Sequence, residues 1–212
     1  MTLLSWQLKR LGACAKPSEW AEHYSNPLLA WRACPRGDWL LWIAARLGVE
    51  REQLVLATCA CARLALPYTT DERPLLTIQM AEQWAAGNPK PHLKDLEAAA
   101  LDTAPSYRAA STAASNAAKC AALLVHAASR TNAAGDAVNV AFYTAIAAAY
   151  SVDAAYSVDA AAYFSTLQKC ADVVRGKIEE NTLLALWERE CEQLEASISP
   201  PRIFGNMDYV YW

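Results

Sequence analysis

The stretch from Ala98 to Tyr163 constrains the fold most, because 27 of its 66 residues are alanine and only seven are charged. Alanine has the highest helix propensity, and its small side chain lets helix axes approach closely. Strand signals are missing from the whole sequence, which has no Asn-Gly or Asp-Gly hairpin turn and no sustained period-two alternation. We therefore predict an all-α fold, a multi-helix bundle or orthogonal helical domain of about eight to ten close-packed helices.

Glycine and proline divide the chain into predicted helices. The first ends near Gly12, and a second begins at Lys16-Pro17 and ends at Asn26-Pro27. Asp38 is the predicted N-cap of a helix that Gly48 closes. The remaining predicted helices cover 50–66, 74–86, 92–103, 106–130, 136–175 and 178–196. The helix over 136–175 would be about 60 Å long if unbroken, so we expect a kink in it.

The composition suits one domain with an appended tail. Hydrophobic residues make up 54% of the chain and charged residues 19%, which is enough apolar surface for a sizeable core. We predict a single helical domain over 1–198, with a Trp/Leu-rich half (1–90) and an Ala/Tyr-rich half (91–198). The segment 199–212 is a separate aromatic tail.

Charge and hydropathy exclude several classes of partner. The formal net charge is −3 and there is no dense Lys/Arg patch, so we expect no direct binding to nucleic acid. No run of 18 apolar residues occurs, so we expect no membrane partner. The seven cysteines are odd in number, and no secretory signal precedes them, which predicts reduced thiols and a cytoplasmic protein.

Sequence signatures of catalysis and of cofactor binding are absent. Cys59-Ala60-Cys61 suggests a metal site, but side chains at i and i+2 of a helix point to different sides. The other cysteines lack Cys-x-x-Cys spacing, and no Gly-x-Ser-x-Gly or phosphate-binding glycine loop is present. We predict no metal, no cofactor and no enzymatic activity. An enzyme with an unfamiliar helical site stays open as an alternative.

Motifs in the first half resemble one bacterial helical family. They are Leu11–Ala15, Ala30–Trp42, Leu54–Arg63, Asp71–Pro74 and Ala81–Gly87, followed by the Ala/Tyr-rich helical half. The likeness covers roughly residues 8–165. It is to a family of immunity proteins of polymorphic-toxin systems. The acidic last helix and the aromatic tail depart from the family pattern.

The resemblance implies a binding function. Immunity proteins neutralise a toxin by binding it tightly, so the expected partner is a protein. Two alternatives remain open. The chain could be a phage-encoded inhibitor of a bacterial defence complex, or a structural or assembly protein that forms a homo-oligomer through its tail.

The expected partner-binding residues lie in the last helix and the tail. The predicted helix over 178–196 carries six glutamates and one basic residue, Arg189, and would attract a basic toxin by electrostatic steering. Aromatic side chains in the tail add binding anchors. The predicted partner-binding residues are Glu188, Glu190, Glu192, Glu195, Tyr209, Tyr211 and Trp212.

A second group of charged residues lies at predicted helix starts and in the 67–73 loop. If these starts meet at one end of the bundle, they form an arginine–carboxylate network that holds the loops together. The members of this predicted polar cluster are Arg36, Asp38, Asp71, Glu72 and Arg73. The nearby stripe of Trp39, Trp42 and Arg46 is typical of a helix core face with an arginine at its edge in a cation–π contact, or of a partner surface.

Overall fold

A computed structural model describes residues 2–87, 109–127, 130–150 and 159–198. Within these ranges every regular element is a helix, which confirms the all-α prediction. In chain order they are α1 (Leu3–Arg10), α2 (Ala15–Ala21), α3 (Pro27–Ala33), α4 (Gly37–Leu47), α5 (Arg51–Arg63), the short 3₁₀ helix η1 (Leu66–Tyr68), α6 (Arg73–Ala85), α8 (Ala109–Leu123), the 3₁₀ helix η2 (Leu124–His126), α9 (Arg130–Ala149), α10 (Ala160–Lys177) and α11 (Glu180–Ile198).

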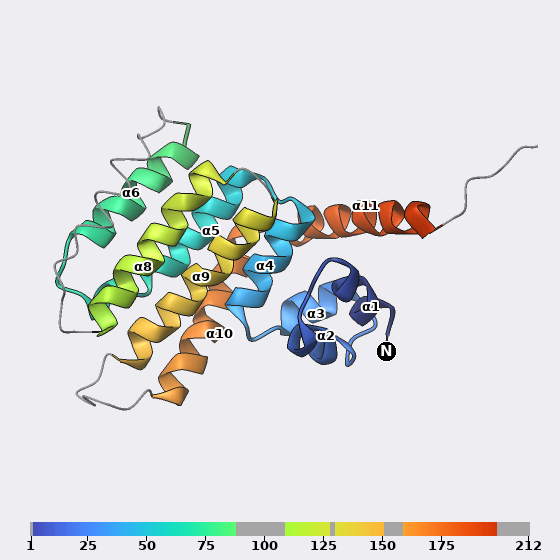
Figure 1. The fold of residues 1–212 in the computed structure, drawn as a ribbon, viewed down its shortest axis with the longest axis horizontal. Coiled ribbons are helices and arrows are strands. Elements are labelled where there is room, and N and C mark those ends of the chain that lie inside the picture. The colour runs from blue at the N-terminus through green and yellow to red at the C-terminus, as the bar shows by residue number, and fades with distance from the viewer. Residues whose placement is uncertain (1, 88–108, 128–129, 151–158, 199–212) are drawn as a thin grey trace, which may run out of the picture.

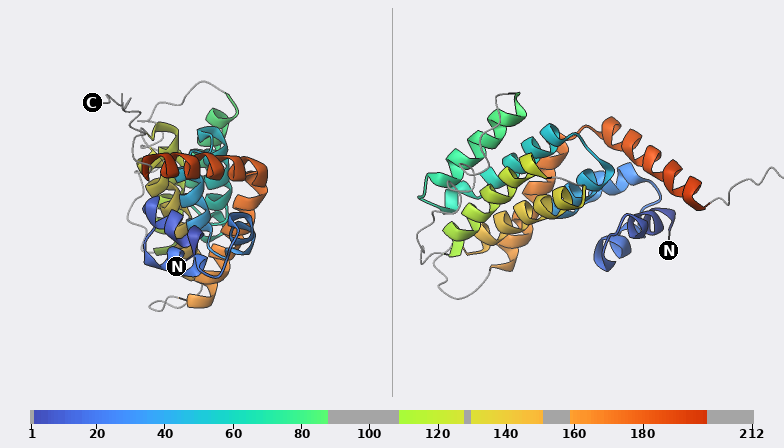
Figure 2. Two further views of the ribbon diagram at one scale, coloured as in Figure 1. Left: turned by 90° about the vertical axis from the view of Figure 1, so that its right-hand side faces the viewer. Right: turned by 45° about the horizontal axis from the view of Figure 1, so that its top comes forward.

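Two central helices organise the body of the protein. α5 packs against α6, α8, α9 and α10, and α9 packs against α4, α5, α8 and α10. α1, α2 and α3 form a smaller unit at one side of this body, and α11 extends past that unit (Figures 1 and 2). The N-terminal unit, α4 and α11 thus meet at one side of the molecule, where the candidate sites lie.

The alanine-rich helices supply the interior. Along α9, Ala137, Ala141 and Ala145 are fully buried at four-residue spacing, so they share one face of the helix. Thr144 between them is also buried, and its hydroxyl donates to the carbonyl oxygens of Val140 at 2.8 Å and Cys61 at 3.4 Å. Small side chains and a satisfied hydroxyl let α9 lie close to four neighbouring helices.

The prediction of one helix over 136–175 is wrong. The chain forms α9 and α10, which pack side by side (Figure 1). The amide of Asp159 donates to the carbonyl of Ala149 at 3.1 Å, and the Asp159 carboxylate caps α10 by accepting from the amides of Ala161 and Ala162. An N-cap aspartate therefore marks the second helix, although the composition on both sides of it is equally helix-forming.

Two further boundaries differ from prediction. Asn26-Pro27 begins α3 rather than ending α2: the Asn26 side chain accepts from the amide of Leu28 at 2.8 Å, with proline in the first turn. α4 begins at Gly37, so Asp38 lies inside the first turn and pairs with Arg36 rather than capping the helix. Gly48 ends α4 with φ +82, as predicted. The predicted helix over 92–103 lies outside the described residues.

Gly37 allows a close approach between α4 and α10. A Cβ at this position would lie 2.4 Å from the Cβ of Cys170 in α10. Only glycine fits such a contact. The same contact fixes where α4 starts relative to α10.

No helix in the described ranges is long and apolar enough to cross a membrane.

Candidate partner-binding surface

The inner face of α11 anchors this helix to the N-terminal unit and α4. Leu183 and Trp187 are buried on that face, at 3% and 6% exposure. Farther along the helix, the Cys191 sulfur accepts a hydrogen bond of 2.9 Å from the side-chain amide of Gln7 in α1. These contacts fix the orientation of α11, so that its opposite face is held toward solvent.

Ion pairs from distant parts of the chain also hold α11. Arg32 in α3 forms a bidentate pair with Glu180, and its guanidinium lowers the pKa of that carboxyl. Arg130 at the start of α9 pairs with Glu190 at 3.2 Å. Sequence reasoning identified only Arg189 as a basic neighbour of this helix. It missed Arg32 and Arg130 because pairs separated by 148 and 60 positions leave no local signal.

The predicted acidic residues of α11 therefore fall into two groups. Glu190 is partly buried and paired, so it serves to attach the helix. Glu188 and Glu192 are exposed and lie four residues apart, on one outward face. The Glu195 side chain, and all of Tyr209, Tyr211 and Trp212, lie outside what the structure describes.

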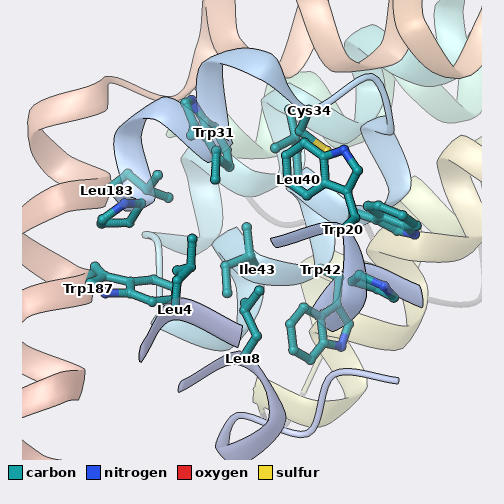
Figure 3. Close-up of a pocket in the computed structure, with 14 residues that line it drawn as sticks. Leu4, Leu8, Trp20, Trp31, Cys34, Leu40, Trp42, Ile43, Leu183 and Trp187 are labelled. Carbon is teal, nitrogen blue, oxygen red and sulfur yellow. The ribbon is translucent and has the colours of Figure 1, made fainter. Parts of the chain in front are cut away.

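A small apolar pocket lies beneath α11, between the N-terminal unit and α4 (Figure 3). Leu4 and Leu8 of α1 point into it, opposite Ile43 of α4 and Leu183 of α11 (Figure 3). The tryptophans that line it are Trp20, Trp31, Trp39, Trp42 and Trp187. Its volume of about 60 Å³ is room for an aliphatic side-chain tip and is smaller than a benzene-sized cavity, roughly 150 Å³.

Cys34 is the titratable side chain in this pocket. Burial raises the pKa of its thiol to about 11, so the group is protonated and unreactive at neutral pH. A nucleophile or a general base needs a pKa nearer the working pH. The pocket walls therefore favour apolar contact over chemistry.

The tryptophan stripe on α4 is split between two environments. Trp39 packs against Trp20 with ring centroids 5.9 Å apart. The Arg36 guanidinium carbon lies over the Trp39 ring, 4.9 Å from its centroid. The cation–π contact on this stripe is thus made by Arg36, whereas Arg46 donates to the Thr131 hydroxyl at 3.2 Å. Trp42 lines both the apolar pocket and an open groove on its other side.

The predicted polar cluster appears as separate ion pairs at two helix starts. Arg36 and Asp38 form a bidentate pair at 2.9 and 2.6 Å beside α10. Asp71 and Arg73 form another at 2.9 and 2.5 Å before α6, and the pair lowers the pKa of the Asp71 carboxyl. α4 and α6 lie on different sides of α5 (Figure 1). Glu72 is exposed at the start of α6.

The two thiols of Cys59-Ala60-Cys61 face different helices. Cys59 contacts the Ile78 carbonyl of α6 at 3.9 Å, and Cys61 contacts the Cys170 carbonyl of α10 at 3.7 Å. This divergence is the expected consequence of i, i+2 spacing on a helix. In the described part of the chain, no group of three or more His, Cys, Asp or Glu side chains is placed to hold a metal ion.

Comparisons with protein-family models, with curated proteins and with solved structures gave no match.

Proposed function

We propose that this chain is a non-catalytic binding protein that sequesters or neutralises a protein partner in the cytoplasm. The resemblance of its N-terminal motifs to toxin-immunity proteins suggests a toxin as that partner. The observation that carries the proposal is the outward face of α11, where Glu188 and Glu192 are exposed on a helix that is fixed from behind.

A fixed acidic face suits capture of a basic protein. The helix is held in place by Leu183, by Trp187 and by the ion pair between Arg130 and Glu190. Its exposed carboxylates are therefore already positioned before a partner arrives. Exposed like charges raise the association rate of an oppositely charged partner, and this effect weakens with salt. Glu195 and the tail residues Tyr209, Tyr211 and Trp212 remain predicted contacts of the same partner.

Rescue of cell growth from the toxic partner tests this function directly. The full chain is co-expressed with the protein that the neighbouring reading frame encodes, and growth is measured. The affinity between the two proteins is measured separately, by titration at low and high salt. The double variant Glu188→Lys/Glu192→Lys should weaken binding at least tenfold at low salt and abolish rescue.

The matched control changes the same amount of charge elsewhere. Glu19→Lys/Glu52→Lys alters two exposed glutamates on α2 and α5 and should leave both rescue and affinity unchanged. Equal weakening by both double variants would show an effect of net charge alone. Full affinity in the α11 variant would overturn the assignment of this face.

A further inference from the structure

An open groove lies on the other side of Trp42 from the apolar pocket. It has a volume of about 500 Å³, much larger than the pocket, and is formed by the end of α1, by α4 and by α9. Its apolar wall includes Leu11, Trp42 and Val138. Arg46, Thr131 and Asn139 supply polar groups along it.

Arg46 gives this groove its charge. Among the residues that the structure describes, its guanidinium forms no ion pair, and it donates a hydrogen bond to the neutral Thr131 hydroxyl. The other residues that line the groove are uncharged. The groove is therefore shaped for an apolar segment that carries a single negative charge.

The chain itself contains such a segment. Residues 199–212 hold six large apolar or aromatic side chains within Phe204–Trp212, together with one acidic residue, Asp208. The only other charged residue of the segment is Arg202, six positions earlier.

The middle of α11, which precedes this segment, lies near the groove. Two contacts of α11 lie beside residues that line the groove. Cys191 accepts a hydrogen bond from Gln7, which is one turn from Leu11. Glu190 pairs with Arg130, which adjoins Thr131. From Cys191 to Ile198 the helix advances only about 10 Å. The ten residues from 199 to 208 span up to about 33 Å when extended. The tail is thus long enough to return to the groove of its own molecule.

We propose that residues 199–212 dock in cis in this groove, with the aromatic side chains against Trp42 and Val138 and the Asp208 carboxylate on the Arg46 guanidinium. The inference goes beyond the proposed function and is independent of the partner, because it concerns how the chain covers its own groove. It predicts backbone amides within this segment that are protected from exchange.

Hydrogen exchange of the full-length chain, followed by mass spectrometry, tests this docking. Amides within 203–212 should exchange at least tenfold more slowly than in a free peptide of the same sequence, at every protein concentration. Arg46→Asp should remove the protection, and Arg46→Asp/Asp208→Arg should recover it. Lys169→Asp, an equal charge change on the exposed side of α10, should have no effect.

A second variant tests the site without touching its charge. A Cβ at Gly135 would meet no atom within 4 Å, so Gly135→Leu places a bulky side chain in the groove without disturbing the core. It should release the tail while the thermal midpoint is retained. Three outcomes would overturn the proposal: free-peptide exchange in the unaltered chain, protection that grows with concentration as a dimer forms, or protection that survives both Arg46→Asp and Gly135→Leu.

Discussion

Gly37 of α4 faces Cys170 of α10 so closely that a Cβ added to the glycine would lie 2.4 Å from the Cβ of the cysteine. Backbone atoms of Cys170 and Ala171 lie 2.9 Å from the same point. The contact cannot be relieved by rotating a side chain, because two of the three nearest atoms belong to the backbone. α4 and α10 would have to move apart.

Gly37→Ala should therefore destabilise the protein by about 1–3 kcal/mol, the usual cost of overpacking. Urea unfolding followed by circular dichroism measures this change. Gly176→Ala in α10 is the matched control, since its added Cβ meets nothing within 4 Å. It should leave stability equal or raise it by up to about 1 kcal/mol. A loss of equal size in both variants would contradict the packing argument.

The pair formed by Arg36 and Asp38 makes a second prediction. Asp38 is only 7% exposed, so Asp38→Ala removes a carboxylate from a half-buried guanidinium and leaves its donors unsatisfied. The expected loss is about 1–3 kcal/mol in the free energy of unfolding. Glu72→Ala, an exposed member of the same predicted cluster, should change stability by less than about 0.5 kcal/mol. Unaltered stability in Asp38→Ala would show that the pair serves another purpose than holding the start of α4.

Fold class was predictable from sequence because alanine content and glycine–proline punctuation are local signals. Gly48 shows this well, since a glycine after an apolar periodic run is enough to place a helix end. The split between α9 and α10 was missed because alanine continues on both sides of Asp159, and only tertiary packing returns the chain on itself. Asn26-Pro27 was misassigned because the same dipeptide can end one helix or begin another.

The candidate site was less predictable than the fold. Sequence identified the glutamates of α11 but could not separate Glu190, which Arg130 binds, from Glu188 and Glu192, which face solvent. That separation depends on which distant helix lies behind α11. The role of Gly37 was equally invisible, because its reason is a residue 133 positions away.

The buried thiols make stability sensitive to alkaline pH. Burial raises the pKa of Cys34 and of Cys120 to about 11, from an ordinary value of 9.0. The unfolded chain therefore loses these protons at a lower pH than the folded chain. The contribution of the two thiols to the free energy of unfolding is fully present below pH 9 and is lost as the pH rises through about 11.

Denaturant midpoints measured between pH 8 and pH 11 test this dependence. The midpoint should fall over that range, and it should fall less steeply in Cys34→Ala/Cys120→Ala. At pH 8, a thiol reagent should modify the exposed Cys14 rapidly and these two cysteines only after unfolding. Rapid labelling of Cys34 in the folded protein would contradict the assigned burial.

The alanine face of α9 gives the last prediction, because it tests whether the interior is filled. Ala141 is fully buried in α9, a helix that packs against α4, α5, α8 and α10. Ala141→Leu should cost about 1–3 kcal/mol through overpacking. Ala161→Leu, on the exposed side of the first turn of α10, should be close to neutral, since leucine and alanine have similar helix propensities. If Ala141→Leu is instead neutral or stabilising in urea unfolding, there is unfilled space beside α9, and a buried ligand site between these helices becomes the better explanation of the alanine-rich sequence.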